Sequence, residues 1–128
     1  MRLLLYLLAA YQGLNGLTML AVPDLWYQLT PGASHTGPAN THFIRDIGLA
    51  FLAASGALLL AARVANPAVP ILIATVFLGG HAALHLVEMV AHGTSLADAI
   101  RDFGLILVPA ALPVLALRSA FCKTGEIS

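Results

Sequence analysis

Four long apolar segments decide what this chain can fold into. They cover residues 3–22, 43–62, 68–90 and 96–117. Each is close to the roughly 20 residues that an α-helix needs to cross the hydrocarbon core of a bilayer. The composition agrees, because only 9% of the residues are charged, against about 25% in a soluble domain. The sequence therefore predicts one all-α domain over residues 1–128, an integral membrane bundle of four transmembrane helices.

The placement of positive charges predicts the orientation of this bundle. Cytoplasmic loops of membrane proteins carry an excess of Lys and Arg. The residues that fit this rule, all on one side of the predicted membrane, are Arg2, Arg63, Arg118 and Lys123. The opposite loops, residues 23–42 and 91–95, contain neither Lys nor Arg. We therefore expect both termini in the cytoplasm, the loop 23–42 facing outward and, for a bacterial protein, insertion in the inner membrane.

Charge and cysteine content exclude some classes of function. The formal net charge is zero, so no basic surface favours nucleic acid. Cys122 is the only cysteine, which excludes an internal disulfide and a dithiol redox centre. The expected partners are the lipid bilayer and either another membrane protein or a second copy of the chain.

A short motif occurs twice, at the start of the second and of the fourth segment. The two copies are FIRDIGLAFL at residues 43–52 and AIRDFGLILV at residues 99–108. Both contain Ile-Arg-Asp followed one residue later by Gly-Leu. We expect two parallel helical-hairpin repeats, related by a pseudo-twofold axis along the membrane normal, which is a known membrane architecture.

The repeated charges predict an ion-pair clamp. Adjacent residues on a helix point about 100° apart, so neither arginine is expected to pair with the aspartate that follows it. Across the pseudo-twofold axis, Arg45 could reach Asp102. In the same way, Arg101 could reach Asp46. We predict this reciprocal clamp near the outer surface; the alternative is that each arginine extends to the lipid headgroups by itself.

Polar residues recur along the third segment, and we call them the polar stripe. They are His81, His85, Glu88 and His92. At 100° per residue they fall within about 60° of one another. Leu86, Val87 and Val90 occupy the opposite side. A charged residue facing hydrocarbon costs at least about 2.5 kcal/mol, so the stripe is predicted to face the inside of the bundle.

The depth of these groups predicts a pocket in the outer half of the bundle. At 1.5 Å per residue, His81 lies roughly 16 Å below the outer surface, near the middle of the membrane. Gln12 and Asn15 lie at similar depths in the first segment, and His42 lies near the mouth. We expect these three residues to support the histidines, with Asn15 or Asp46 fixing the imidazole tautomers. The cytoplasmic halves of the segments are almost purely apolar, so the pocket is open to the outside and closed below.

The polar stripe admits three interpretations. Imidazole and carboxylate groups suit zinc, copper or iron, so a bound transition metal is one. A small organic ligand is the second, including a haem with His81 or His85 as axial ligand, or a quinone. The third is a hydrogen-bonded network that holds helices together and binds nothing. No nucleophile stands beside a base, which favours a protein that is not an enzyme on its own.

The short spans and one motif resemble those of a known family. The second segment starts with Arg45, two residues, Gly48 and Leu49, and continues with small residues such as Gly56. This pattern resembles the DoxX-like group of bacterial membrane proteins. The resemblance implies an accessory or quinone-interacting subunit of a membrane oxidoreductase. It assigns no role to the polar stripe, which is not part of the family's pattern.

Overall fold

The computed structural model describes residues 1–124, except for the side chains of residues 35–36 and 118–124. Arg118, Cys122 and Lys123 therefore lie outside the described side chains. The elements are α1 (Arg2–Ala21), α2 (Pro23–Leu29), η1 (Ala33–Thr36), α3 (Thr41–Arg63), α4 (Ala68–His92), α5 (Leu96–Asp102), the π-helical η2 (Phe103–Leu107) and α6 (Val108–Thr124). No strand occurs in the described part of the chain, so the all-α prediction is confirmed.

Four of the helical stretches are long and apolar enough to cross a membrane. They are Arg2–Ala21, Thr41–Arg63, Ala68–His92 and the continuous run Leu96–Leu117, which is built from α5, η2 and most of α6. Each lies where the sequence predicts a span. Pro23 is the first residue of α2, one residue beyond the end of α1, and Pro67 directly precedes α4. Proline lacks the N–H that would continue a preceding helix.

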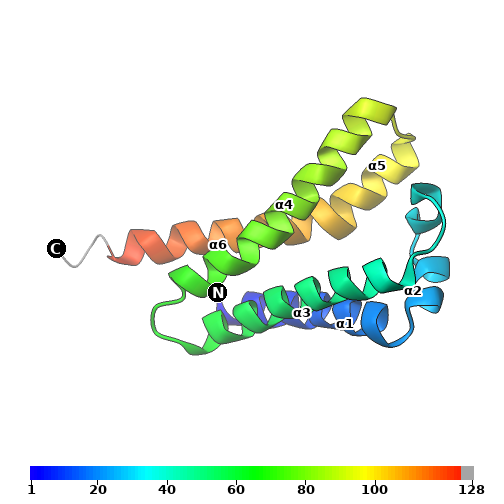
Figure 1. Cartoon of the computed structure of the whole chain (residues 1–128). Coiled ribbons are helices and arrows are strands. Elements are labelled where there is room, and N and C mark those ends of the chain that lie inside the picture. The colour runs from blue at the N-terminus through cyan, green and yellow to red at the C-terminus, as the bar shows by residue number, and fades with distance from the viewer. Residues whose placement is uncertain (125–128) are drawn as a thin grey trace.

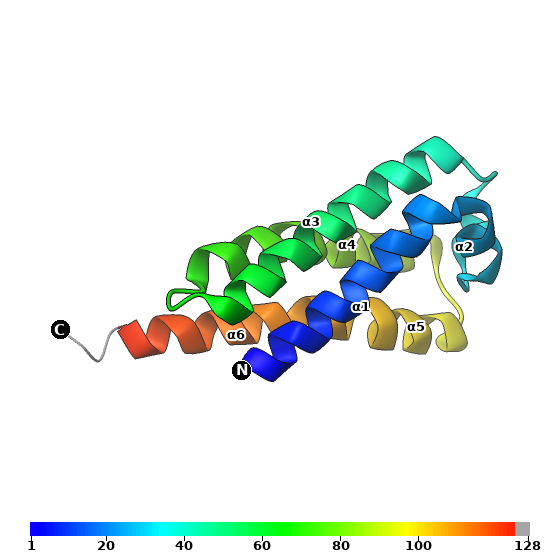
Figure 2. The same ribbon diagram turned by 90° about the horizontal axis from the view of Figure 1, so that it is seen from below.

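The helices form two antiparallel hairpins, α1 with α3 and α4 with α6, which pack against each other at one end of the molecule. The start of α1 and the end of α6 lie toward that end, while α2 and the start of α5 lie toward the other (Figure 1). α1 packs on α3, α3 packs on α4, and α4 packs on α6. Figure 1 shows α4 and α5 rising away from α1 and α3 as they approach the α2 end, and Figure 2 shows α3 beside α1 along the first hairpin. The second hairpin therefore diverges from the first at one end.

Small residues allow the first hairpin to pack closely. A Cβ added to Gly16 would lie 2.7 Å from the carbonyl oxygen of Gly48, and one added to Gly48 would lie 2.9 Å from the Cβ of Met19. Two helical turns further along, the Ser55 hydroxyl donates a 2.7 Å hydrogen bond to the Ala9 carbonyl. Close backbone approach and interhelical hydrogen bonds are the two main ways in which helices associate in lipid.

A proline shapes the fourth span. Pro109 has no N–H to donate to the carbonyl four residues earlier, which is that of Leu105. The chain widens into the π-helical segment η2 at this point, and the Tyr11 hydroxyl donates to the Leu105 carbonyl at 2.8 Å. A neighbouring helix thus satisfies the backbone group that the proline leaves free, as membrane helices require. This bond also joins α1 to the second hairpin.

The glycine contact in the first hairpin gives a stability prediction. Gly48→Val should lower the unfolding free energy by about 1–3 kcal/mol, because the new side chain overlaps Met19 and the Gly16 backbone. Gly56→Val is the matched control, since an added Cβ there meets nothing within 4 Å on the same helix. Unfolding in mixed micelles, followed by circular dichroism, measures both variants. Equal losses in the two variants would show that the close approach does not stabilise the hairpin.

Candidate functional site

A histidine and an aspartate meet between the two helices of the second hairpin. His85 Nδ1 on α4 lies 3.3 Å from Asp102 Oδ2 on α5, and the side chains are 28% and 12% exposed. An ionised carboxylate only accepts hydrogen bonds, so Nδ1 carries the hydrogen. In the neutral ring, Nε2 is then an acceptor, and it makes no hydrogen bond to any other described residue. We call this arrangement the His85–Asp102 pair.

The second oxygen of the same carboxylate is held by an arginine. Arg101 Nε and Nη2 lie 2.9 and 2.8 Å from Asp102 Oδ1, and Arg101 Nη1 lies 2.5 Å from Asp98 Oδ1. The Ser95 hydroxyl donates to the other Asp98 oxygen at 2.7 Å. These contacts hold Oδ1 of the Asp102 carboxylate on the side of Arg101, and its other oxygen, Oδ2, faces the His85 imidazole.

The outward loop also lies against this arginine. A Cβ added to Gly32 would lie 2.8 Å from Arg101 Nη2, and Gly32 has φ +87°, a conformation that favours glycine. The same loop is anchored to the first hairpin, because Trp26 Nε1 donates to Asn15 Oδ1 at 2.9 Å. Arg101 is therefore a meeting point of the outward loop and the second hairpin.

Aromatic rings lead from the core to the His85–Asp102 pair. The His81 ring contacts the ring of His85 at 4.8 Å between centroids, that of Phe51 at 5.3 Å, and that of Phe77 at 6.1 Å. Phe51 and Phe77 meet edge to face at 5.0 Å. Edge-to-face and offset arrangements are those that aromatic pairs prefer. The polar pair therefore adjoins a surface of flat, mainly apolar rings from α3 and α4.

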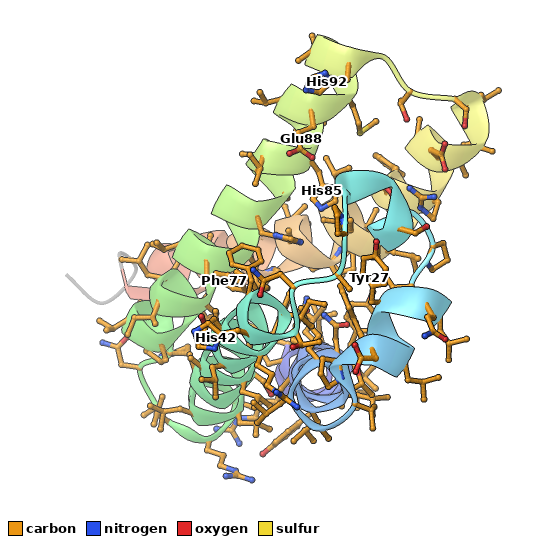
Figure 3. The ribbon with its side chains drawn as sticks, turned by 45° about the vertical axis from the view of Figure 1, so that its right-hand side comes forward. Tyr27, His42, Phe77, His85, Glu88 and His92 are labelled. Atoms are coloured by element: carbon orange, nitrogen blue, oxygen red, sulfur yellow. The ribbon has the colours of Figure 1, made fainter. Side chains whose placement is uncertain are left out.

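The structure divides the polar stripe. His81 and His85 are half-buried, while Leu86, Val87 and Val90 are exposed on the other side, as predicted. Glu88 and His92 are exposed and do not join the two histidines, contrary to the prediction. The reason is that α4 continues past the packed part of the bundle, so its outer turns project away from the other helices (Figure 3). The face is the predicted one, but nothing packs against its outer half.

No metal centre forms from these groups. Among the described residues, no set of three or more His, Cys, Asp or Glu side chains is placed to hold a metal ion. The four stripe residues span eleven positions, or about 16 Å along the helix, which is far more than one ion can bridge. Asp102, which could serve as a ligand beside His85, is already shared with Arg101.

The predicted supporting residues lie elsewhere. Asn15 holds Trp26 and so fixes the corner between α1 and α2. His42 Nε2 lies 3.5 Å from Asp46 Oδ2 on the exposed face of α3. Gln12 is buried in α1 and, among the described residues, makes no hydrogen bond to either histidine. The residue that orients His85 is Asp102, which the sequence had placed in the ion-pair clamp.

The reciprocal clamp does not form in the described structure. Arg45 Nε donates to the Leu20 carbonyl at 3.3 Å. Arg101 pairs with Asp98 and with the adjacent Asp102, since its long side chain curls back across the 100° that separates neighbours. The hairpins diverge at this end, so the charges of the two copies stand in different environments. Arg45 and Asp46 are exposed, whereas Arg101 is half-buried and Asp102 is buried.

Some of the site residues carried signals that the sequence reading did not use. Ser95 and Asp98 have the spacing of a helix N-cap, and the Ser95 hydroxyl does accept from the Asp98 N–H at 3.1 Å. Arg101 then follows Asp98 by three positions, a spacing at which opposite charges on a helix interact. The roles of Phe51 and Gly32 had no such local signal, because each depends on a segment distant in sequence.

Comparison of the chain with protein-family models, with curated proteins and with solved structures finds no match. The resemblance to the DoxX-like group therefore stays a prediction. The function must be argued from the site itself.

Proposed function

We propose that this chain is an integral membrane protein that binds a lipid-soluble small molecule at the His85–Asp102 pair. Insertion in the bilayer is supported by the four long apolar helices and by the apolar groups on their outer faces. Leu14 on α1, Val76 on α4 and Leu115 on α6 are 66%, 70% and 58% exposed. A soluble monomer rarely exposes contiguous apolar surface of this extent.

The oriented imidazole carries the proposal. Ionisable groups inside membrane helices are expensive and mark functional sites by default. His85 is turned by Asp102 so that one ring nitrogen is used and the other has no described partner, while more than a quarter of the side chain stays accessible. The same logic fixes the tautomer of histidines that bind ligands in other proteins. A histidine that only joined two helices would not need an accessible edge.

The surroundings favour an organic ligand over a metal ion. The half-buried rings of Phe77 and His81 lie beside the pair and pack on the buried Phe51, and apolar groups with a few placed polar groups are typical of small-molecule sites. A transition metal would find His85 and His81, with no third free ligand placed nearby in the described residues.

A quinone and its reduced form, a quinol with aromatic hydroxyl groups, belong to this ligand class, and the DoxX-like resemblance supports these members of it. The chain would then be an accessory subunit that presents the molecule to a membrane oxidoreductase. The residues of the site would bind the molecule, and the partner oxidoreductase would carry out its oxidation or reduction.

The proposed orientation is tested by labelling. We expect both termini in the cytoplasm and η1 outside, because Arg2 and Arg63 lie at the end opposite the outward loop. In a Cys122→Ser background, Ser34→Cys on exposed η1 should react with an impermeant maleimide added to intact bacterial cells. The parent protein, with Cys122 alone, should react only after lysis. The reverse pattern would contradict the orientation.

The proposed ligand class is tested by thermal unfolding of the detergent-purified protein with 2-naphthol, 1,4-naphthoquinone, oleic acid or Zn²⁺. At least one organic probe should raise Tm in a saturable way, since a ligand at 100 times its Kd adds about 2.7 kcal/mol of stability. His85→Phe should abolish the rise, whereas the control His92→Phe, on the projecting end of α4, should retain it.

Two outcomes would contradict the proposal. In the first, no organic probe stabilises the wild type, or all stabilise His85→Phe equally, which would leave the His85–Asp102 pair as a structural contact. In the second, only Zn²⁺ stabilises the protein and His85→Phe removes the effect, which would make the site a metal site.

A further inference from the structure

We infer that the ligand presents a hydroxyl group that donates a hydrogen bond to His85 Nε2, and that it belongs to the class of lipid-soluble aromatic alcohols. This inference rests on the proposed function and names the chemistry that the same site selects. It follows from counting the hydrogen-bond donors and acceptors that the His85–Asp102 pair and its neighbours leave unused.

The donors that point at the pair are already engaged. His85 Nδ1 faces the Asp102 carboxylate. All three nitrogens of Arg101 lie within 2.9 Å of a carboxylate oxygen of Asp98 or Asp102. Each guanidinium nitrogen thus directs one N–H at Asp98 or Asp102, and neither of the two remaining N–H groups contacts His85 among the described residues.

An acceptor remains. Neutral imidazole has one N–H and one lone pair, so directing the N–H at Asp102 leaves the lone pair on Nε2. The site therefore complements a donor. A ligand carbonyl would place its oxygen lone pair against the lone pair of Nε2. Both groups would then lack a hydrogen bond, which would weaken binding.

The charge of the neighbourhood excludes an acidic head group. The Asp102 carboxylate lies 3.3 Å from the His85 ring, so an anion bound at this imidazole would stand close to an existing negative charge. An anionic head would be repelled at short range, and strongly so where the effective dielectric constant is low. A neutral hydroxyl avoids this repulsion and supplies the required donor.

The adjoining surface suits an aromatic body. His81 stands edge to face with Phe51 and with His85, at interplanar angles of 82° and 71°. Phe51 is buried, so the half-buried rings of His81, His85 and Phe77 are those that can contact another ring, by a face or an edge. The hydroxyl and the ring of one phenol-type molecule therefore match two adjacent features of the same site.

The test compares three naphthalene probes that differ in hydrogen bonding. 2-Naphthol donates, 2-methoxynaphthalene has the same ring without a donor, and 1,4-naphthoquinone only accepts. Binding to the detergent-solubilised full chain is measured by fluorescence or calorimetry at about pH 8, where imidazole in water is neutral. 2-Naphthol should bind about tenfold more tightly than either other probe, the difference expected from one hydrogen bond and an avoided unpaired group.

Asp102→Asn provides the sharper comparison. The amide can donate to Nδ1, which moves the ring hydrogen to Nε2 and turns this nitrogen into a donor, as when an asparagine replaces the aspartate of a catalytic triad. The preference should then invert, with 1,4-naphthoquinone above 2-naphthol. His85→Phe keeps a ring but has no Nε2, so it should bind 2-naphthol and 2-methoxynaphthalene equally. If Asp102→Asn loses its helical circular dichroism, and so does not fold, the comparison of probes in His85→Phe tests the inference instead.

The outcomes separate this inference from the proposed function. If 2-methoxynaphthalene or 1,4-naphthoquinone binds the wild type as tightly as 2-naphthol, the site does not select a donor, while a lipid-soluble ligand stands. If His85→Phe retains the tenfold preference, His85 is not the acceptor. If none of the three probes binds, the inference fails, and oleic acid, the remaining organic probe of the panel above, decides whether the proposed function fails with it.

Discussion

The Asp102 carboxylate is the group on which the second hairpin depends. One of its oxygens is held by Arg101 and the other faces His85, so a single side chain joins α5 to α4. A buried charge is tolerated only when it is paired and hydrogen-bonded, and this carboxylate has both kinds of partner. The same contact that makes the charge tolerable also orients the imidazole. Structure and the proposed binding chemistry therefore rest on one interaction, and the outward loop reaches it through Gly32 at Arg101.

The two hairpins are built in different ways. The first is closed by backbone approach at Gly16 and Gly48, where no larger side chain fits. The second is looser at its outer end, and its fourth span is interrupted by a π-helical segment before Pro109. The Tyr11 hydroxyl satisfies the Leu105 carbonyl there, so the irregular backbone leaves this polar group paired. π-helical segments are frequent at functional sites, and this one begins at the residue after Asp102. The close-packed first hairpin thus supports the second hairpin, which contains the His85–Asp102 pair.

Periodicity and hydropathy predict the helices well, because each long span is one continuous apolar run. They also predict the face of α4, since Val87 and Val90 lie opposite His81 and His85. They do not predict the point along the chain at which two packed helices separate. Glu88 shares the face of His85 and yet is exposed, because α4 leaves the bundle before reaching it. The predicted ion-pair clamp between the two Arg-Asp pairs was wrong for a related reason. It assumed a symmetry that the hairpins, which diverge at their outer end, do not have. The pairing of His85 with Asp102 joins residues seventeen apart through a turn whose geometry no local pattern records.

The central claim is that Asp102 holds His85 with its hydrogen on Nδ1 and leaves Nε2 free to accept. Nitrogen-15 NMR of histidine-labelled protein in lipid, at a pH where the ring is neutral, reports which nitrogen carries the hydrogen. The resonances of His85 are assigned by their absence in His85→Phe. The account predicts a protonated Nδ1 and an unprotonated Nε2 for this residue. A hydrogen on Nε2, with Nδ1 bare beside the carboxylate, would contradict the orientation of the pair and the ligand chemistry derived from it.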